Sequence, residues 1–172
     1  MESETMKLHK KKAPIHVSCG IITLSDRFSN DEDGKEKDLS GQILIEELGK
    51  KYSVDSYEII ADEKEILLNT IETMIDNGRE VIFTTGGTGL ESRDISIETI
   101  EPLFEKQMPG FGEIFRSISY ERLGAGALLS RATAGIYKKT LIFALPGSPD
   151  AVKTGLGIIL EELGHLKKHA RK

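Results

Sequence analysis

The chain has 172 residues, of which 38% are hydrophobic and 30% are charged, and its formal net charge is −5. This length can bury a full hydrophobic core, and the single cysteine excludes a fold held together by internal disulfides. The negative charge argues against general nucleic-acid binding, and the lack of a long apolar run argues against a membrane protein, so we expect a cytoplasmic location.

The start of the first apolar run sets the expected boundary between an N-terminal tail and the folded domain. Residues 1–14 are polar and contain a basic cluster at 7–12, so we expect a flexible N-terminal tail there. Residues 15–172 show no internal repeat and no second hydrophobic domain, which predicts a single α/β domain. Cys19 lies inside the apolar run, where a buried small side chain is expected rather than a nucleophile.

The first strand is predicted over residues 17–24, and it ends in Ser25, Asp26 and Arg27. In open α/β sheets ligands bind beyond the carboxyl ends of the strands, so these polar residues could edge a site, although Ser and Asp are also common in loops. Residues 30–41 have the composition of a solvated, flexible loop. Ser40 is the expected N-cap of the helix that follows it.

The second strand is predicted over residues 52–60, and Asp62 follows it. Two interpretations stay open. Asp62 and Glu65 have the spacing of a capping box for the next helix. Alternatively, Asp62 and Asp94 both follow apolar strands, so they could meet at one edge of a parallel sheet and hold Mg²⁺ on a phosphate chain.

A glycine-rich turn follows the third apolar run, which begins at Val81. Three glycines in four positions allow left-handed backbone and turn successive N–H groups into one concavity, which suits a phosphate at the start of a helix. The spacing is not that of a P-loop, and Ser92 stands where a Rossmann fingerprint has its last glycine. We favour a ligand-binding turn over a merely tight connection. The turn comprises Thr85, Gly86, Gly87, Thr88 and Gly89.

The middle of the chain gives weaker signals. Residues 95–104 have a helical pattern, residues 109–112 break it with proline and glycine, and residues 113–120 resume it. The glycines and alanine of residues 124–127 indicate a flexible connection. Residues 128–135 fit either a helix or a loop followed by a strand.

The last strand is predicted over residues 139–145 and runs into Pro146, Gly147 and Ser148. A helix over residues 150–163 follows. The prolines on either side of Ser148 could present its hydroxyl rigidly to a ligand, or they could simply begin the helix. None of the four histidines has a ligand partner at a short spacing that predicts a metal site. Alternating strands and helices predict a three-layer α/β/α sandwich with a mainly parallel sheet.

Several separated motifs, taken together and in order, resemble the MoaB/MogA-type molybdopterin-binding family. These motifs are LSDR, DE, TTGGTGLESRD, PGFGEIFR, LSRATAG and LPGSPDAV, and they extend from about residue 17 to about residue 163. The resemblance implies a three-layer α/β fold and a homo-oligomer, either a trimer or a hexamer. It also implies Mg²⁺-dependent adenylylation of molybdopterin by ATP with release of pyrophosphate, before a downstream enzyme inserts the metal.

The resemblance also implies roles for individual residues. Asp62 and Asp94 match the two acids of the family that are essential for adenylylation, and the glycines of the turn match its phosphate-binding loop. Further positions match the rest of the pocket: Ser25, Asp26, Ser130, Arg131, Pro146, Gly147 and Ser148. Of these, Arg131 is the expected anion contact.

Two other functions remain open at this point. Fold alone does not fix activity, so the chain could be a catalytically silent molybdopterin carrier or a nucleotide hydrolase built on the same fold. The carrier predicts pterin binding without pyrophosphate release. The hydrolase predicts nucleotide turnover without pterin.

Overall fold

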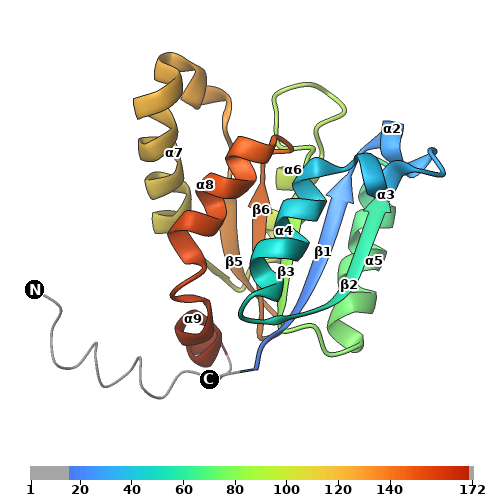
Figure 1. Ribbon diagram of the computed structural model, residues 1–172. Helices are drawn as coiled ribbons and strands as arrows, with labels where there is room; N and C mark the ends of the chain where they lie inside the picture. The colour runs from blue at the N-terminus through green and yellow to red at the C-terminus, as the bar shows by residue number, and fades with distance from the viewer. Residues whose placement is uncertain (1–15, 171–172) are drawn as a thin grey trace, which may run out of the picture.

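The computed structural model describes residues 16–170, which form one six-stranded sheet with helices on both faces (Figure 1). The strands are β1 (Ser18–Leu24), β2 (Ser53–Ile60), β3 (Val81–Thr85), β4 (Lys106–Gln107), β5 (Thr133–Tyr137) and β6 (Thr140–Leu145). The helices are α2 (Asp26–Ser29), α3 (Gly34–Lys37), α4 (Leu39–Gly49), α5 (Lys64–Asp76), α6 (Ser96–Ile100), α7 (Pro109–Leu123), α8 (Pro149–Ile159) and α9 (Leu163–Ala170), with 3₁₀ turns η1 (Glu101–Leu103) and η2 (Gly124–Leu129).

The sheet has the strand order β2-β1-β3-β6-β5-β4. Its first four strands are parallel, and β5 and β4 add an antiparallel edge. Helices α4, α7 and α8 cover one face of the sheet, and α5 and α6 cover the other (Figure 1). The predicted three-layer sandwich with a mainly parallel sheet is thereby confirmed.

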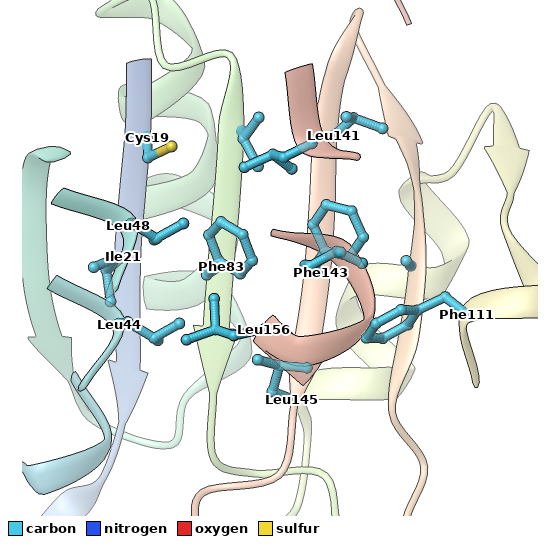
Figure 2. Packing of buried hydrophobic residues seen from close by; sticks show 14 of the residues in the cluster. Cys19, Ile21, Leu44, Leu48, Phe83, Phe111, Leu141, Phe143, Leu145 and Leu156 are labelled. Carbon is cyan, nitrogen blue, oxygen red and sulfur yellow. The ribbon is translucent and has the colours of Figure 1, made fainter. Parts of the chain in front are cut away.

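Each face of the sheet carries its own hydrophobic core. On the first face, Phe83 and Phe143 stack with ring centroids 5.3 Å apart, beneath Leu156 of α8 (Figure 2). Cys19 is fully buried in the same core, and this burial, more than the nearby acidic charges, raises the pKa of its thiol to about 12. The thiol therefore stays protonated and packs as a small apolar group, as expected.

The second core lies under the helices of the opposite face. Leu67, Ile71 and Met74 come from one side of α5, and Ile97 and Ile100 come from α6. Strand residues alternate between the two cores, because successive side chains of a strand point to opposite faces of its sheet. Both faces of the inner sheet are apolar, which explains why β3 and β6 are buried at every position, whereas the edge strand β2 is mostly polar and only partly buried.

The structure corrects several predicted boundaries. Residues 30–41 are not a flexible loop, because they contain α3 and the start of α4. Asp38 caps α4 in place of Ser40, and its side chain accepts a hydrogen bond from the Gly41 N–H at 3.0 Å. Pro109 begins α7 instead of breaking it, because proline suits the first turn of a helix, where its missing N–H has no partner to lose.

Three later segments also differ from the prediction. Residues 124–129 form η2 rather than a loose connection, and residues 133–137 form β5, which settles the segment that the sequence left open. The predicted helix over 150–163 is two helices, because α8 ends at Ile159 and α9 begins at Leu163. The predicted tail, residues 1–14, lies outside the described residues. Within 16–170, no helix has the length and apolar character needed to cross a membrane.

Candidate active site

The candidate site lies where the chain changes direction across the sheet. Strand β1 lies between the edge strand β2 and the inner strand β3, so the loops leaving β1 toward β2 and leaving β2 toward β3 run in opposite directions across the sheet. Such a switch point opens a crevice in parallel sheets. The cleft found there has a volume of about 660 Å³ and is lined by Leu24, Ser25, Asp26, Arg27, Asp62, Gly87, Glu91, Arg93 and Asp94.

Two aspartates tie the loops after β1 and β2 together. The backbone N–H of Asp26 donates to Asp62 Oδ2 at 3.1 Å, and the N–H of Asp62 donates to Asp26 Oδ1 at 2.9 Å. Ser25 caps the short helix α2 by accepting a hydrogen bond from the Phe28 N–H at 3.2 Å. These reciprocal bonds hold both carboxylates at the edge of the cleft.

The capping interpretation of Asp62 is wrong. Helix α5 begins after Glu63, and no side chain makes a capping hydrogen bond there. The Asp62 carboxylate instead faces the cleft, where Oδ1 lies 3.3 Å from the point at which a Cβ on Gly87 would sit. The structure therefore supports the alternative, in which Asp62 and Asp94 meet at one sheet edge.

Asp94 reaches this edge from the loop between β3 and α6. Its Oδ2 accepts a hydrogen bond from the Glu91 N–H at 2.9 Å, and its own N–H donates to the Glu91 carbonyl at 2.9 Å. The pKa of Asp62 is raised above its usual value, first by burial and then by the charge of Asp94. Two carboxylates that disturb each other in this way attract a cation.

Arg93 and Glu91 are cleft residues that the sequence analysis did not assign. The guanidinium of Arg93 forms an ion pair with Asp26 across the mouth of the cleft, although both side chains are substantially exposed. The only signal in the sequence was the position of Arg93 directly before Asp94. An exposed arginine beside three carboxylates can exchange its partner for a phosphate when an anionic ligand enters.

The glycine turn has the backbone that the sequence predicts. Gly86 and Gly87 have φ values of +97° and +63°, and a Cβ on Gly86 would lie 2.4 Å from the Leu24 carbonyl oxygen. Among the described residues, the N–H groups of Gly87, Thr88 and Gly89 donate to no protein acceptor. Three such donors in succession form a nest for an anion.

Side chains from the far end of the chain hold this turn in place. Ser96 Oγ donates to the Gly86 carbonyl at 2.7 Å, and Arg131 Nε donates to the Thr88 carbonyl at 3.0 Å. Arg131 also contacts the Gly89 carbonyl and forms an ion pair with Glu98. Arg131 therefore supports the turn from behind. It lines a separate pocket with Glu98 and Arg116 and not the acidic cleft. The anion contact that the resemblance implied stays a prediction.

The turn after β6 packs directly against the glycine turn. A Cβ on Gly147 would lie 3.2 Å from Gly86 Cα, and Thr85 Oγ1 donates to the Pro146 carbonyl at 3.2 Å. The Ser148 hydroxyl accepts a hydrogen bond from the Ala151 N–H at 3.2 Å and so caps α8. The helix-start interpretation of this serine is thus confirmed, and its hydroxyl oxygen is engaged in the cap.

Eight of the fourteen predicted site residues fall into two groups; the others are Arg131, which lines a third pocket, and Thr85, Gly86, Thr88, Gly89 and Gly147, which line neither space. Ser25, Asp26, Asp62, Gly87 and Asp94 share the acidic cleft. The other group borders a separate groove between α7, η2 and α8 on the opposite side of the glycine turn, and comprises Ser130, Pro146 and Ser148. The Ser130 hydroxyl is buried there and has no hydrogen-bond partner among the described residues.

The oxygen atoms that line the cleft suit Mg²⁺. Carboxylate oxygens are the hard ligands that this ion prefers, and Asp62 and Asp94 each leave Oδ1 without a hydrogen bond in the described structure. No group of three His, Cys, Asp or Glu within residues 16–170 could hold a metal ion by itself. The cleft therefore fits an ion that shares one or two protein carboxylates with water and substrate phosphates.

Comparisons with known proteins agree with this architecture. Residues 20–165 match a family model described as a probable molybdopterin binding domain. The chain is 46% identical over 168 residues to a protein of Pyrococcus furiosus named molybdopterin adenylyltransferase, covering 95% of this chain and 97% of that relative. It is 42% identical over 170 residues to molybdenum cofactor biosynthesis protein B of Bacillus subtilis, with coverage of 95% and 96%.

A solved structure of a related protein has the same fold. The crystal structure of the tungsten cofactor synthesizing protein MoaB from Pyrococcus furiosus superposes with a TM-score of 0.86 at 46% identity, covering 93% of this chain and all of that one. Sequence, fold and the order of the motifs therefore agree over nearly the whole chain. The chain belongs to the molybdopterin-binding family of the MoaB type.

Proposed function

We propose that this protein adenylylates molybdopterin with Mg²⁺ and ATP in the acidic cleft. The relatives named molybdopterin adenylyltransferase, from Pyrococcus furiosus and Methanocaldococcus jannaschii, are 46% and 42% identical to the chain and support this activity. The observation that carries the proposal is the convergence of Asp62 and Asp94 with the glycine turn, from the ends of separate strands, in one cleft.

The reaction joins two anions. An oxygen of the terminal phosphate of molybdopterin attacks the α-phosphorus of ATP, and a new O–P bond forms. The bond from the α-phosphorus to the bridging oxygen breaks, and its electron pair leaves with pyrophosphate. A protein contributes to such a transfer by positioning and by neutralising charge.

Each part of the cleft has a role in this scheme. The open N–H groups of Gly87, Thr88 and Gly89 bind phosphate oxygens, and Asp62 and Asp94 would hold Mg²⁺. The ion would neutralise phosphate charge that the acidic cleft repels. Arg93 is placed to leave Asp26 and bind a phosphate oxygen, which frees the Asp26 carboxylate to accept hydrogen bonds from the substrate.

The groove on the other side of the glycine turn is assigned to the pterin. It is lined by apolar groups such as Phe115 and Leu129, together with the hydroxyls of Ser119 and Ser130, so it suits a flat ring system with polar edges. Gly147 and Gly86 are in contact between the groove and the cleft. A ligand crossing at these two glycines would carry its phosphate toward the nest.

The protein is proposed to work as a homo-oligomer, either a trimer or a hexamer. Large apolar side chains of α7 and η2 are exposed on one stretch of the chain: Tyr120 is 64%, Leu123 67%, Leu128 79% and Leu129 60% exposed. Exposed apolar side chains clustered along the chain in this way favour a subunit interface. A downstream metal-insertion enzyme as partner, a cytoplasmic location and the lack of nucleic-acid binding stay predictions.

Pyrophosphate release by the purified protein tests the proposal. With Mg²⁺, ATP and molybdopterin present, we expect release that stops when the pterin is omitted. Release that continues without pterin would identify a nucleotide hydrolase instead. Pterin binding without any release would identify a silent carrier, and either result would overturn the proposal.

A further inference from the structure

The last helix carries a group of side chains that the proposed reaction does not use. Helix α9 lies at the end of the sheet opposite the cleft (Figure 1). Lys167 fixes it there by donating from Nζ to the Lys139 carbonyl at 2.8 Å, directly before β6 begins. A ligand on α9 would therefore bind independently of the cleft, which lies at the carboxyl ends of the strands.

His165 and His169 face each other on one side of this helix. They are four residues apart, which places them one helical turn apart on the same face. Their Nε2 atoms are 2.9 Å apart, and their rings lie with centroids at 4.8 Å and planes inclined by 22°. The sequence indicated no metal site at these histidines, and the structure adds only that their side chains lie together.

Two imidazole nitrogens at this separation suit a shared cation. Zinc–imidazole bonds are about 2.0–2.1 Å long, so two nitrogens 2.9 Å apart can occupy adjacent positions around one ion. Histidines at i and i+4 on a helix are also the ligand arrangement of helical zinc sites. To share an ion, both Nε2 atoms would turn their lone pairs from each other toward it.

A neighbouring carboxylate favours the same use of these rings. Glu162 Oε2 lies 3.8 Å from His165 Nδ1, one turn earlier on the same side of the chain. Histidines that bind metals commonly have a carboxylate near the ring nitrogen that does not bind the ion. His169 is exposed and His165 is partly exposed, so an ion can reach both from solvent.

We propose that His165 and His169 form a binding site for a borderline divalent cation such as Zn²⁺, Ni²⁺ or Cu²⁺. The protein supplies two ligands, because no group of three candidate ligands occurs in the described part of the chain, and water completes the coordination. Imidazole nitrogens select these ions over Mg²⁺, which prefers oxygen. The site is thus chemically distinct from the acidic cleft, and binding there would bridge one turn of α9.

Calorimetric titration of the full-length protein without an affinity tag tests this site. Ni²⁺ is the titrant, and excess Mg²⁺ is kept in the buffer to compete at the carboxylates of the cleft. The variants are His165→Gln and His169→Gln, and the matched control is the double variant His9→Gln/His16→Gln, which removes the other two histidines of the chain. Circular dichroism confirms that each variant is folded.

We expect one Ni²⁺ per chain in the unmodified protein and in the His9/His16 control. Each single variant in the pair should weaken binding by about tenfold or more, because the second ligand is delivered at high effective concentration only when the first is present. Glu162→Gln should weaken it less. Ni²⁺ binding that survives in both His165→Gln and His169→Gln, or that is lost in the control, would overturn the proposal.

Discussion

Aspartates in two neighbouring regions of the molecule have opposite roles. Asp38 lies on one face of the sheet at the start of α4, whereas Asp62 and Asp94 lie at the open edge above β1, β2 and β3. Asp62 and Asp94 lie in the loops after β2 and β3, whereas Asp38 follows β1 only after the two short helices α2 and α3. The difference between them lies in how many of their oxygens the protein itself uses.

The oxygens of Asp38 are all engaged. Its Oδ2 accepts hydrogen bonds from Thr23 Oγ1 at 2.5 Å and Tyr57 Oη at 2.7 Å, and its Oδ1 accepts one from the Gly41 N–H. The residue is only 2% exposed. Burial, followed by the hydrogen bond to Asp38, raises the pKa of Tyr57, so its hydroxyl remains a donor at neutral pH.

Within residues 16–170, Asp62 and Asp94 each accept a single backbone N–H bond, so the fold leaves part of their binding capacity open. A saturated buried carboxylate stabilises the fold, because removing it would leave its donors unsatisfied. An unsaturated carboxylate at a cleft is free to bind a cation or a substrate. Five predictions test this division, beginning with the largest expected effect and ending with the smallest.

The largest effect is expected from Asp62→Asn and Asp94→Asn. Each should lower the rate of pyrophosphate release by about 10²–10³-fold, which is typical for removing an electrostatic contact at a reacting centre. If both carboxylates hold one ion, the double variant should be little worse than the more damaging single one. Steady-state kinetics with saturating ATP measure this.

The loss of activity in these variants should not be accompanied by a loss of folding stability. The raised pKa of Asp62 means that its ionised form costs folding free energy at neutral pH, so Asp62→Asn should leave the free energy of unfolding unchanged or slightly higher. Asp76→Asn, an exposed acid at the end of α5, is the matched control. A large loss of stability in Asp62→Asn would show that this carboxylate is structural.

Asp38→Ala should show the reverse pattern. We expect a loss of about 2–4 kcal/mol in the free energy of unfolding, because the hydroxyls of Thr23 and Tyr57 would be left buried without their acceptor. Urea denaturation measures the loss. A variant as stable as the unmodified protein would contradict the structural role of Asp38.

Gly86→Ala should lower both stability and activity. The added Cβ would meet the Leu24 carbonyl at 2.4 Å, and alanine tolerates a φ of +97° poorly, so we expect a loss of stability of about 1–3 kcal/mol. Activity should fall further than this loss explains, because the N–H nest moves with the turn. Gly157→Ala is the control, since a Cβ there meets nothing within 4 Å. A Gly86→Ala protein with normal ATP binding would contradict the nest.

The smallest effect concerns the electrostatic coupling within the cleft. Asp94→Asn removes the second of the two causes that raise the pKa of Asp62, so that pKa should fall but stay above the usual value, because burial remains. Carbon-detected NMR titration of the Asp62 carboxyl group measures this shift. An unchanged pKa would mean that the charge of Asp94 does not act on the Asp62 carboxylate.

The sequence predicted the features that depend on short stretches of chain. The inner strands β1, β3 and β6 are mostly apolar, and the glycine turn is encoded within a few positions, so these features could be located before the structure was known. Asp62 and Asp94 could be placed at one edge because the ends of parallel strands meet there. Whether Asp62 caps α5 or faces the cleft could be decided only from the hydrogen bonds in the structure.

The features that the sequence could not predict depend on distant partners. Asp38 appeared to lie in a solvated loop, but its partners are Thr23 and Tyr57, 15 and 19 residues away. Arg131 supports a carbonyl 43 residues away in the glycine turn, and this contact explains why it is not in the cleft. No local pattern encodes such pairs, because they form only when the helices pack on the sheet.

The most direct test of the account compares Asp94→Asn with Asp38→Asn in one experiment. Pyrophosphate release is measured with Mg²⁺, ATP and molybdopterin at a temperature where circular dichroism shows both variants fully folded. We predict that Asp94→Asn has lost nearly all activity while Asp38→Asn keeps most of it. Normal activity in Asp94→Asn, or equal loss in both variants, would contradict the division between catalytic and structural carboxylates.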